Sequence, residues 1–180
     1  MYCILRHYST IIFCLSWYNI LYYETEMRFF SMIKVLFVCH GNICRSPISE
    51  FMMKDMVKKL GIEDHFEIAS CATSTEEIGN PVYPPARRIL SAHGISCQGK
   101  TARQITRRDL AYYDYIILMD SNNMRNLRWM FPNEDLGNVR MMLPRDVADP
   151  WYTGNFDATW RDCEEGITNL IEEIRNKENI

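Results

Sequence analysis

A cysteine and an arginine frame the segment of this sequence that is best suited to chemistry. Cys39 ends a run of apolar and β-branched residues, and Arg45 follows six positions later, just before a serine-proline pair. A tight turn between a strand and a helix directs backbone N–H groups and the positive helix end at one point. An arginine guanidinium matches two oxygens of a phosphate. The segment therefore predicts a cradle for a tetrahedral oxyanion, with the Cys39 sulfur beneath it and Arg45 across its mouth.

The positive surroundings favour the thiolate of Cys39 over the thiol, which makes this cysteine a candidate nucleophile. The Ser46 hydroxyl is a candidate hydrogen-bond donor to the sulfur, and the Asn42 side chain is a candidate brace for the loop. A lone cysteine beside a turn glycine such as Gly41 is more simply a buried residue at a strand end. The glycine, asparagine, arginine, serine and proline that follow in one segment favour the functional interpretation.

Efficient cleavage of a phosphate ester by a cysteine also needs a second group that protonates the leaving oxygen. Such an acid typically raises the rate by about 10²–10⁴-fold. Asp149 is the candidate acid, because it follows the fourth predicted strand, on the side of a parallel sheet where the cradle lies. Pro150 stiffens this turn, and Trp151 and Tyr152 are expected to wall a slot around an aromatic ring. An isolated Asp-Pro pair is an ordinary turn, but the cradle upstream favours an acid.

The elements that position these residues alternate between strand and helix. Short apolar runs predict strands over 33–39, 66–71, 115–119 and 139–143. Capping residues and periodicity predict helices over 46–60, 84–93, 120–130 and from 155 onward. Ser46 is expected as the N-cap of the first helix, with Glu50 in its first turn. The alternation predicts an α/β fold in three layers, with a four-stranded parallel sheet and helices on both faces.

This chain resembles the low-molecular-weight protein tyrosine phosphatases in the run Val38-Cys39-His40-Gly41-Asn42-Ile43-Cys44-Arg45-Ser46-Pro47. The likeness extends over most of the chain and includes Ser70, Ala102-Arg103-Gln104, Met119-Asp120 and Asp149-Pro150-Trp151-Tyr152. It implies the phosphotyrosine phosphatase I-like fold for residues 32–180. It also implies hydrolysis of phosphotyrosine monoesters through a phosphocysteine intermediate.

The resemblance also implies roles for individual residues. Cys39 corresponds to the nucleophile, Arg45 to the phosphate-binding arginine and Asp149 to the general acid. Substrate-binding positions are His40, Gly41, Asn42, Ile43, Cys44, Ser46, Trp151 and Tyr152, and supporting positions are Ser70 and Asp120. No metal or other cofactor is expected, because the loop amides and the arginine supply the positive charge. The expected partner is a phosphotyrosine protein, such as a tyrosine kinase, and inorganic phosphate is the product.

Three positions leave the details of the site open. Cys44 matches a second loop cysteine of many relatives, so it is either the partner of Cys39 in a reversible protective disulfide or a tightly packed small residue. Several relatives carry a histidine just before Ala102-Arg103-Gln104, whereas Gly99 occupies that region here, so one partner of the supporting network is expected to be absent. Glu76 and Glu77 stand where many relatives have an aromatic residue, and they should repel strongly acidic phosphopeptides.

Three rival functions share the cradle. A thioredoxin-coupled arsenate reductase needs two further cysteines on one mobile segment, but Cys97 is alone in its region and Cys71 lies on a predicted strand. A protein-arginine phosphatase is associated with threonine at the position of Ile43. A phosphate-binding or phosphocarrier domain has no need of an acid at Asp149. Phosphotyrosine hydrolysis is the favoured prediction.

The amino-acid composition limits the classes of protein to which this chain can belong. The chain has 180 residues, 47% of them hydrophobic and 24% charged, which fits one globular domain. The net charge of −3 argues against a dedicated nucleic-acid binder. The seven cysteines are odd in number and match neither a secreted disulfide framework nor a zinc site, so a reduced, cytoplasmic protein is expected.

The first 31 residues differ from the rest, because they hold nine of the 22 aromatic residues. No charged residue lies between Arg6 and Glu24, but this window is shorter than the ~20 residues of a membrane span, and polar residues interrupt it. We interpret residues 1–31 as a poorly ordered extension translated from upstream of a start at Met32. The alternatives are a helix or strand packed on the domain and a membrane or export signal. We do not expect the protein to bind a membrane.

Overall fold

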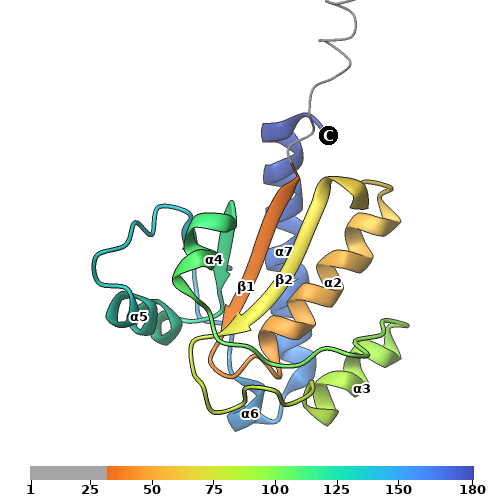
Figure 1. The fold of residues 1–180 in the computed structure, drawn as a ribbon. Coiled ribbons are helices and arrows are strands. Elements are labelled where there is room, and N and C mark those ends of the chain that lie inside the picture. Colours follow the sequence, from red (N-terminus) through yellow and green to blue (C-terminus); the bar gives the residue numbers. More distant parts are fainter. Residues whose placement is uncertain (1–31) are drawn as a thin grey trace, which may run out of the picture. The chain divides into compact units, whose positions relative to one another are not determined.

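Four parallel strands form the central sheet of residues 32–180, the part of the chain described by a computed structural model (Figure 1). The strands are β1 (Ile33–Cys39), β2 (Phe66–Ala72), β3 (Tyr115–Leu118) and β4 (Val139–Met141). Their order is β2-β1-β3-β4, and each neighbouring pair is parallel. The predicted four-stranded parallel sheet is therefore confirmed. The extension predicted for residues 1–31 lies outside the described residues.

Alternate side chains of β1 enter two separate cores, which is why this strand is apolar along nearly its whole length. Val35 and Phe37 pack in the core beneath α2 (Arg45–Lys59), α3 (Pro84–Ala92) and α7 (Phe156–Glu178). Leu36 and Val38 pack in the opposite core, with residues of α4 (Arg107–Tyr112) and α5 (Ser121–Met130). The sheet is thus covered on both faces, as the alternation predicted. None of the helices between residues 32 and 180 is both long and apolar enough to cross a membrane.

The strand order places a ligand site at the carboxyl end of β1. The chain passes from β1 to β2 on one side and then crosses to β3 on the other side of β1. The loops that leave neighbouring strands therefore diverge at the end of β1, and this divergence opens a crevice. The segment 39–46, which we call the phosphate loop, runs from the end of β1 into α2 (Figure 1).

Helix boundaries near the phosphate loop differ from the prediction. Helix α2 begins at Arg45 with Cys44 as its N-cap residue, so Ser46 lies inside the helix and does not cap it. Glu50 consequently lies beyond the first turn, and it is buried. The prediction also missed the short helices α4 and α6 (Pro150–Thr153) and the 3-10 turn η1 (Glu63–His65). Helices of four to six residues carry too few periodic positions to be recognised by pattern.

Candidate active site

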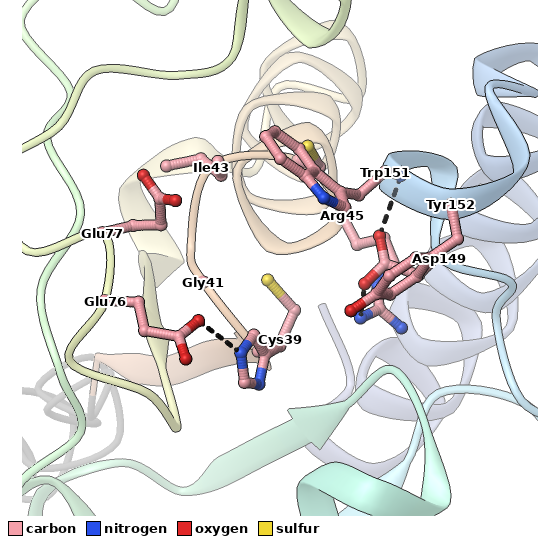
Figure 2. Close-up of a pocket in the computed structure, with 11 residues that line it drawn as sticks. Cys39, Gly41, Ile43, Arg45, Glu76, Glu77, Asp149, Trp151 and Tyr152 are labelled. Atoms are coloured by element: carbon pink, nitrogen blue, oxygen red, sulfur yellow. Dashed lines mark hydrogen bonds and ion pairs between the residues drawn. The ribbon is translucent and has the colours of Figure 1, made fainter.

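A cavity of about 130 Å³ opens at the carboxyl end of β1 (Figure 2). Its lining combines the phosphate loop, the loop after β2 and the start of α6: Cys39, His40, Gly41, Ile43, Cys44, Arg45, Glu76, Glu77, Asp149, Trp151 and Tyr152. Figure 2 shows the Cys39 sulfur and the Asp149 carboxylate inside the same pocket. The structure thus brings together the nucleophile, arginine and acid candidates, which are up to 110 positions apart in the sequence.

The Cys39 sulfur lies in a polar setting although the residue is only 3% exposed. The backbone N–H of Asn42 donates to Sγ at 3.2 Å, and the Ser46 hydroxyl lies 3.0 Å from it. Both contacts suit a thiolate, which accepts hydrogen bonds and donates none. Ser46 reaches the sulfur because it stands in the first turn of α2, directly above the end of β1.

Asn42 braces the loop, as predicted. Its backbone has φ 57°, in the left-handed region that asparagine tolerates better than most residues. Its side-chain amide donates to the hydroxyls of Ser46 at 2.9 Å and Ser70 at 2.8 Å, and its carbonyl oxygen accepts from the backbone N–H of Arg103 at 3.2 Å. The side chain is fully buried, so these bonds hold both the turn and the Ser46 hydroxyl in place.

A buried ion pair supports this network from behind. The Ser70 hydroxyl donates to Glu50 at 2.6 Å, and the Lys100 ammonium lies 3.0 Å from the same carboxylate oxygen of Glu50 and donates to the Ser70 carbonyl at 2.9 Å. The histidine of several relatives is absent near Gly99, as the sequence indicates, and the neighbouring Lys100 contributes these contacts to the network. Burial raises the pKa of Glu50, but Lys100, with Lys54 and Ser70, outweighs it and holds this pKa below its usual range.

Sequence reasoning gave Glu50 no role at the site and missed Lys100. Glu50 follows Ser46 by four positions on one helix, so the two side chains share a face. That spacing was the available signal for Glu50. Nothing in the sequence pairs Lys100 with Glu50, because the contact spans 50 positions and depends on the path of the chain before α4.

Arg45 lies inside the site and not across its mouth, because only 2% of the residue is exposed. One terminal nitrogen of its guanidinium donates to Asp120 at 2.5 Å and to the Val147 carbonyl at 3.1 Å, and the other donates to Asp149 at 2.6 Å. Burial lowers the pKa of Arg45, but the charges of Cys39, Asp149 and Asp120 outweigh it and raise this pKa. Its Nε atom is buried and has no hydrogen-bond partner among the described residues. A free donor in this place suits an incoming oxyanion.

Asp120 both caps α5 and binds the guanidinium of Arg45. One carboxylate oxygen accepts from the Asn123 backbone N–H at 2.7 Å and caps α5, while the other accepts from Arg45. The carboxylate therefore fixes the arginine relative to the end of β3.

Asp149 is the N-cap residue of α6. One of its oxygens accepts from the Trp151 backbone N–H at 3.1 Å, and the other accepts from Arg45. Trp151 and Tyr152 are 53% and 84% exposed, so they stand at the mouth of the cavity as the predicted wall requires. The ring of Tyr83, a residue that sequence reasoning missed, packs against Trp151 with 4.9 Å between ring centroids.

The opposite rim of the cavity is acidic. Figure 2 shows Glu76 and Glu77 across the pocket from Trp151. His40 contacts the Glu76 carboxylate at 3.0 Å, and the Glu77 carboxylate accepts from the Asn80 amide at 2.7 Å. Both acidic side chains therefore lie beside the pocket. Their expected repulsion of acidic phosphopeptides stays a prediction.

Cys44 is a free, buried thiol packed with Ile43 and Ala102. Burial raises the pKa of Cys44, and the negative charges of Cys39 and Asp149 raise it further. The thiol form is thus favoured at this position. The disulfide between Cys39 and Cys44 stays a prediction.

Comparisons with known proteins identify the family of this chain. The family model for low molecular weight phosphotyrosine protein phosphatases matches residues 34–179. The low molecular weight protein-tyrosine-phosphatase YfkJ of Bacillus subtilis is 37% identical over 156 residues, which cover 83% of this chain and all of YfkJ. The crystal structure of YfkJ matches with a TM-score of 0.79 over 82% of this chain and 97% of that chain.

A second solved structure and a mammalian relative extend the likeness. The low molecular weight protein tyrosine phosphatase SP-PTP of Streptococcus pyogenes is 39% identical, with a TM-score of 0.74 over 79% of this chain and 93% of that chain. The phosphatase of Rattus norvegicus is 39% identical over 139 residues, which cover 72% of this chain and 87% of the rat protein. The chain therefore belongs to the low molecular weight phosphotyrosine protein phosphatase family.

Proposed function

We propose that this protein-tyrosine phosphatase hydrolyses phosphotyrosine monoesters in two steps at Cys39. In the first step the sulfur attacks phosphorus in line, the bond from phosphorus to the tyrosine oxygen breaks, and Asp149 gives its proton to that oxygen. In the second step water attacks the phosphocysteine, the Asp149 carboxylate takes a proton from it, and the bond between sulfur and phosphorus breaks. The thiolate is restored and inorganic phosphate leaves.

One observation carries this proposal: the Cys39 sulfur accepts the N–H of Asn42 in the same cavity that holds Arg45 and Asp149. The loop N–H groups and the guanidinium are then placed to hold the equatorial oxygens of the phosphoryl group, whose charge is spread over them in the transition state. Ser70 and Asp120 have a supporting role, since Ser70 binds the Asn42 side chain and Asp120 binds the guanidinium, while the pair of Glu50 and Lys100 holds Ser70 from behind.

The ion pair between Arg45 and Asp149 is the resting arrangement of the proposed site. An entering phosphate brings oxygens that compete with the Asp149 carboxylate for the guanidinium. Once it has left the guanidinium, the Asp149 carboxylate takes a proton from solvent, lies beside the leaving oxygen and gives that proton to it. The free Nε of Arg45 supplies a further donor for the phosphate.

The substrate side of the cavity suits an aromatic ester. Trp151 and Tyr152 present two ring faces beside the acid, and Ile43 offers an apolar side chain to the same space. We infer a phosphotyrosine protein, such as a tyrosine kinase, as the physiological substrate, a cytoplasmic location, and residues 32–180 as the catalytic domain.

Kinetics of the full chain on p-nitrophenyl phosphate and a phosphotyrosine peptide test the proposal. Cys39→Ser should lower kcat by about 10³-fold or more, because the hydroxyl is a far weaker nucleophile at neutral pH. Asp149→Ala should lower kcat by about 10²–10⁴-fold and still bind the peptide. Asp146→Ala is the matched control, because Asp146 precedes Asp149 in the same loop but binds Ser121 at 2.9 Å. The control should retain most activity.

Three outcomes would overturn the proposal. Full turnover by Cys39→Ser would show that Cys39 is not the nucleophile. Equal losses of activity in the Asp146 and Asp149 variants would show that Asp149 is not the acid. Faster turnover of phosphoarginine or arsenate than of phosphotyrosine, measured with the same preparation, favours the arginine phosphatase or the arsenate reductase instead.

A further inference from the structure

The acid-bearing helix α6 is a single, mostly exposed turn. It has four residues, of which only Pro150 is buried, and Gly154 ends it in the left-handed conformation. A single helical turn of this length has little stability of its own. Its place beside the phosphate loop must therefore come from tertiary contacts made by a few side chains.

Tyr83 supplies one of these contacts from a different part of the chain. Its ring lies 4.9 Å from the Trp151 ring at an interplanar angle of 55°, and 6.2 Å from the Phe156 ring. Both distances lie in the range of favourable aromatic pairs. Tyr83 thus contacts the acid-bearing helix and the first residue of α7 at once.

The backbone of Tyr83 is fixed to the phosphate loop. Its N–H donates to the Ile43 carbonyl at 2.9 Å, and its ring packs against the cluster formed by Ile43, Cys44 and Ala102. Two prolines follow it in the first turn of α3 and restrict the backbone further. The ring is therefore held by the loop that carries the nucleophile, and it offers a fixed face to Trp151.

Tyr83 reaches the aromatic wall of the cavity through Trp151. Trp151 lines the cavity, whereas Tyr83 is not among the lining residues of the described chain. The Trp151 backbone N–H also donates to the Asp149 carboxylate. A shift of Trp151 thus changes both the aromatic wall and the hydrogen bonding of the acid.

We propose that Tyr83 is a positioning residue that holds Trp151, and with it the Asp149 helix, at a fixed width from the phosphate loop. This inference rests on the proposed function, because the slot it describes is the one that receives the phosphotyrosine ring. Tyr83 contacts neither the phosphoryl group nor the reacting atoms. Its contribution is to the selection and alignment of an aromatic ester.

Kinetics with a phosphotyrosine peptide test this proposal. Tyr83→Ala should raise KM by about two- to tenfold, the range expected for loss of one aromatic pair, with a smaller effect on kcat. Tyr83→Phe keeps the ring and should restore the wild-type KM. Inhibition by inorganic phosphate should stay within about twofold of wild type in both variants, because phosphate does not reach the aromatic wall. Tyr112→Ala is the matched control, since it removes an aromatic contact of 5.1 Å on α4.

A double-mutant cycle gives the sharper result. If Tyr83 acts through Trp151, adding Tyr83→Ala to Trp151→Ala should change KM little further. Additive effects in the cycle, an unchanged KM in Tyr83→Ala, or an equal effect of Tyr112→Ala would overturn the proposal. Failure of the proposed function is a separate result, because it appears as wild-type protein that does not hydrolyse phosphotyrosine.

Discussion

The buried pair of Lys100 and Glu50 allows a quantitative prediction about the support of the phosphate loop. Replacing Lys100 by Met keeps the length of the side chain and removes its charge. Glu50 then stays buried, with a side chain only 5% exposed and without its nearly buried cation. Removing one partner of a buried pair costs about 3 kcal/mol of unfolding free energy. For a domain of this size that corresponds to roughly 6–12 °C in Tm.

Lys54 is the matched control, because it contacts the same carboxylate. Its ammonium lies 2.5 Å from the other oxygen of Glu50, but the Lys54 side chain is 43% exposed. Water screens the half-exposed Lys54 ammonium, so the loss of this pair should cost about 1 kcal/mol or less. Lys54→Met should therefore lower Tm clearly less than Lys100→Met, and urea unfolding of both variants measures the difference. The kcat/KM for phosphotyrosine should fall several-fold in Lys100→Met alone, because only Lys100 also holds Ser70.

The pH dependence of the Lys100 effect has a defined sign. The pKa of Glu50 is lower in the folded chain than its usual value, so its ionised form stabilises the fold above the usual glutamate range. This stabilisation is lost as the pH falls through the lowered pKa. The gap between wild type and Lys100→Met should thus be widest near neutral pH and close in acid. Equal losses in the Lys54 and Lys100 variants, or a gap that stays constant into acid, would refute the reasoning.

Two further predictions concern the cavity and the turn. Glu77→Lys should reverse a preference for basic over acidic residues beside the phosphotyrosine, because the Glu77 carboxylate stands at the rim and, among residues 32–180, is hydrogen-bonded only to the neutral amide of Asn80. The ratio of kcat/KM between a lysine-flanked and a glutamate-flanked peptide measures this preference, and an unchanged ratio counts against it. Asn42→Gly relieves the left-handed backbone but removes three side-chain hydrogen bonds, whereas Asn42→Ala adds about 1–2 kcal/mol of strain to the same loss. Both should lower kcat, and the alanine variant should also unfold at a lower urea concentration; equal stability of the two would contradict the strain.

The sheet was predictable because its strands are short apolar runs separated by clear helix signals. Phe37 and Val38 point to opposite cores, so the pattern along β1 is continuous and easily recognised. The start of α2 was placed too late, because the serine-proline pair at Ser46 is typical of an N-terminus. In the structure that hydroxyl faces the Cys39 sulfur, and the helix begins one residue earlier.

The members of the site were predictable to the extent that they lie on one segment or carry a recognisable motif. Cys39 and Arg45 share a loop, and the Asp-Pro pair marks Asp149. Lys100 and Tyr83 lie on irregular segments, and their partners depend on the path of those segments in space. No periodicity or local motif in the sequence indicates that path, so only the three-dimensional structure reveals the roles of these two residues.

The pairing of Arg45 with Asp149 also bears on how the product departs. Because an internal carboxylate already neutralises the guanidinium, an arriving phosphate exchanges with an anion of the chain and does not meet a bare cation. The net gain on association is then a difference between two similar interactions, so we expect free phosphate to bind weakly. In the proposed mechanism the same exchange frees Asp149 for proton transfer when a phosphate is bound, which links the acid to the presence of substrate.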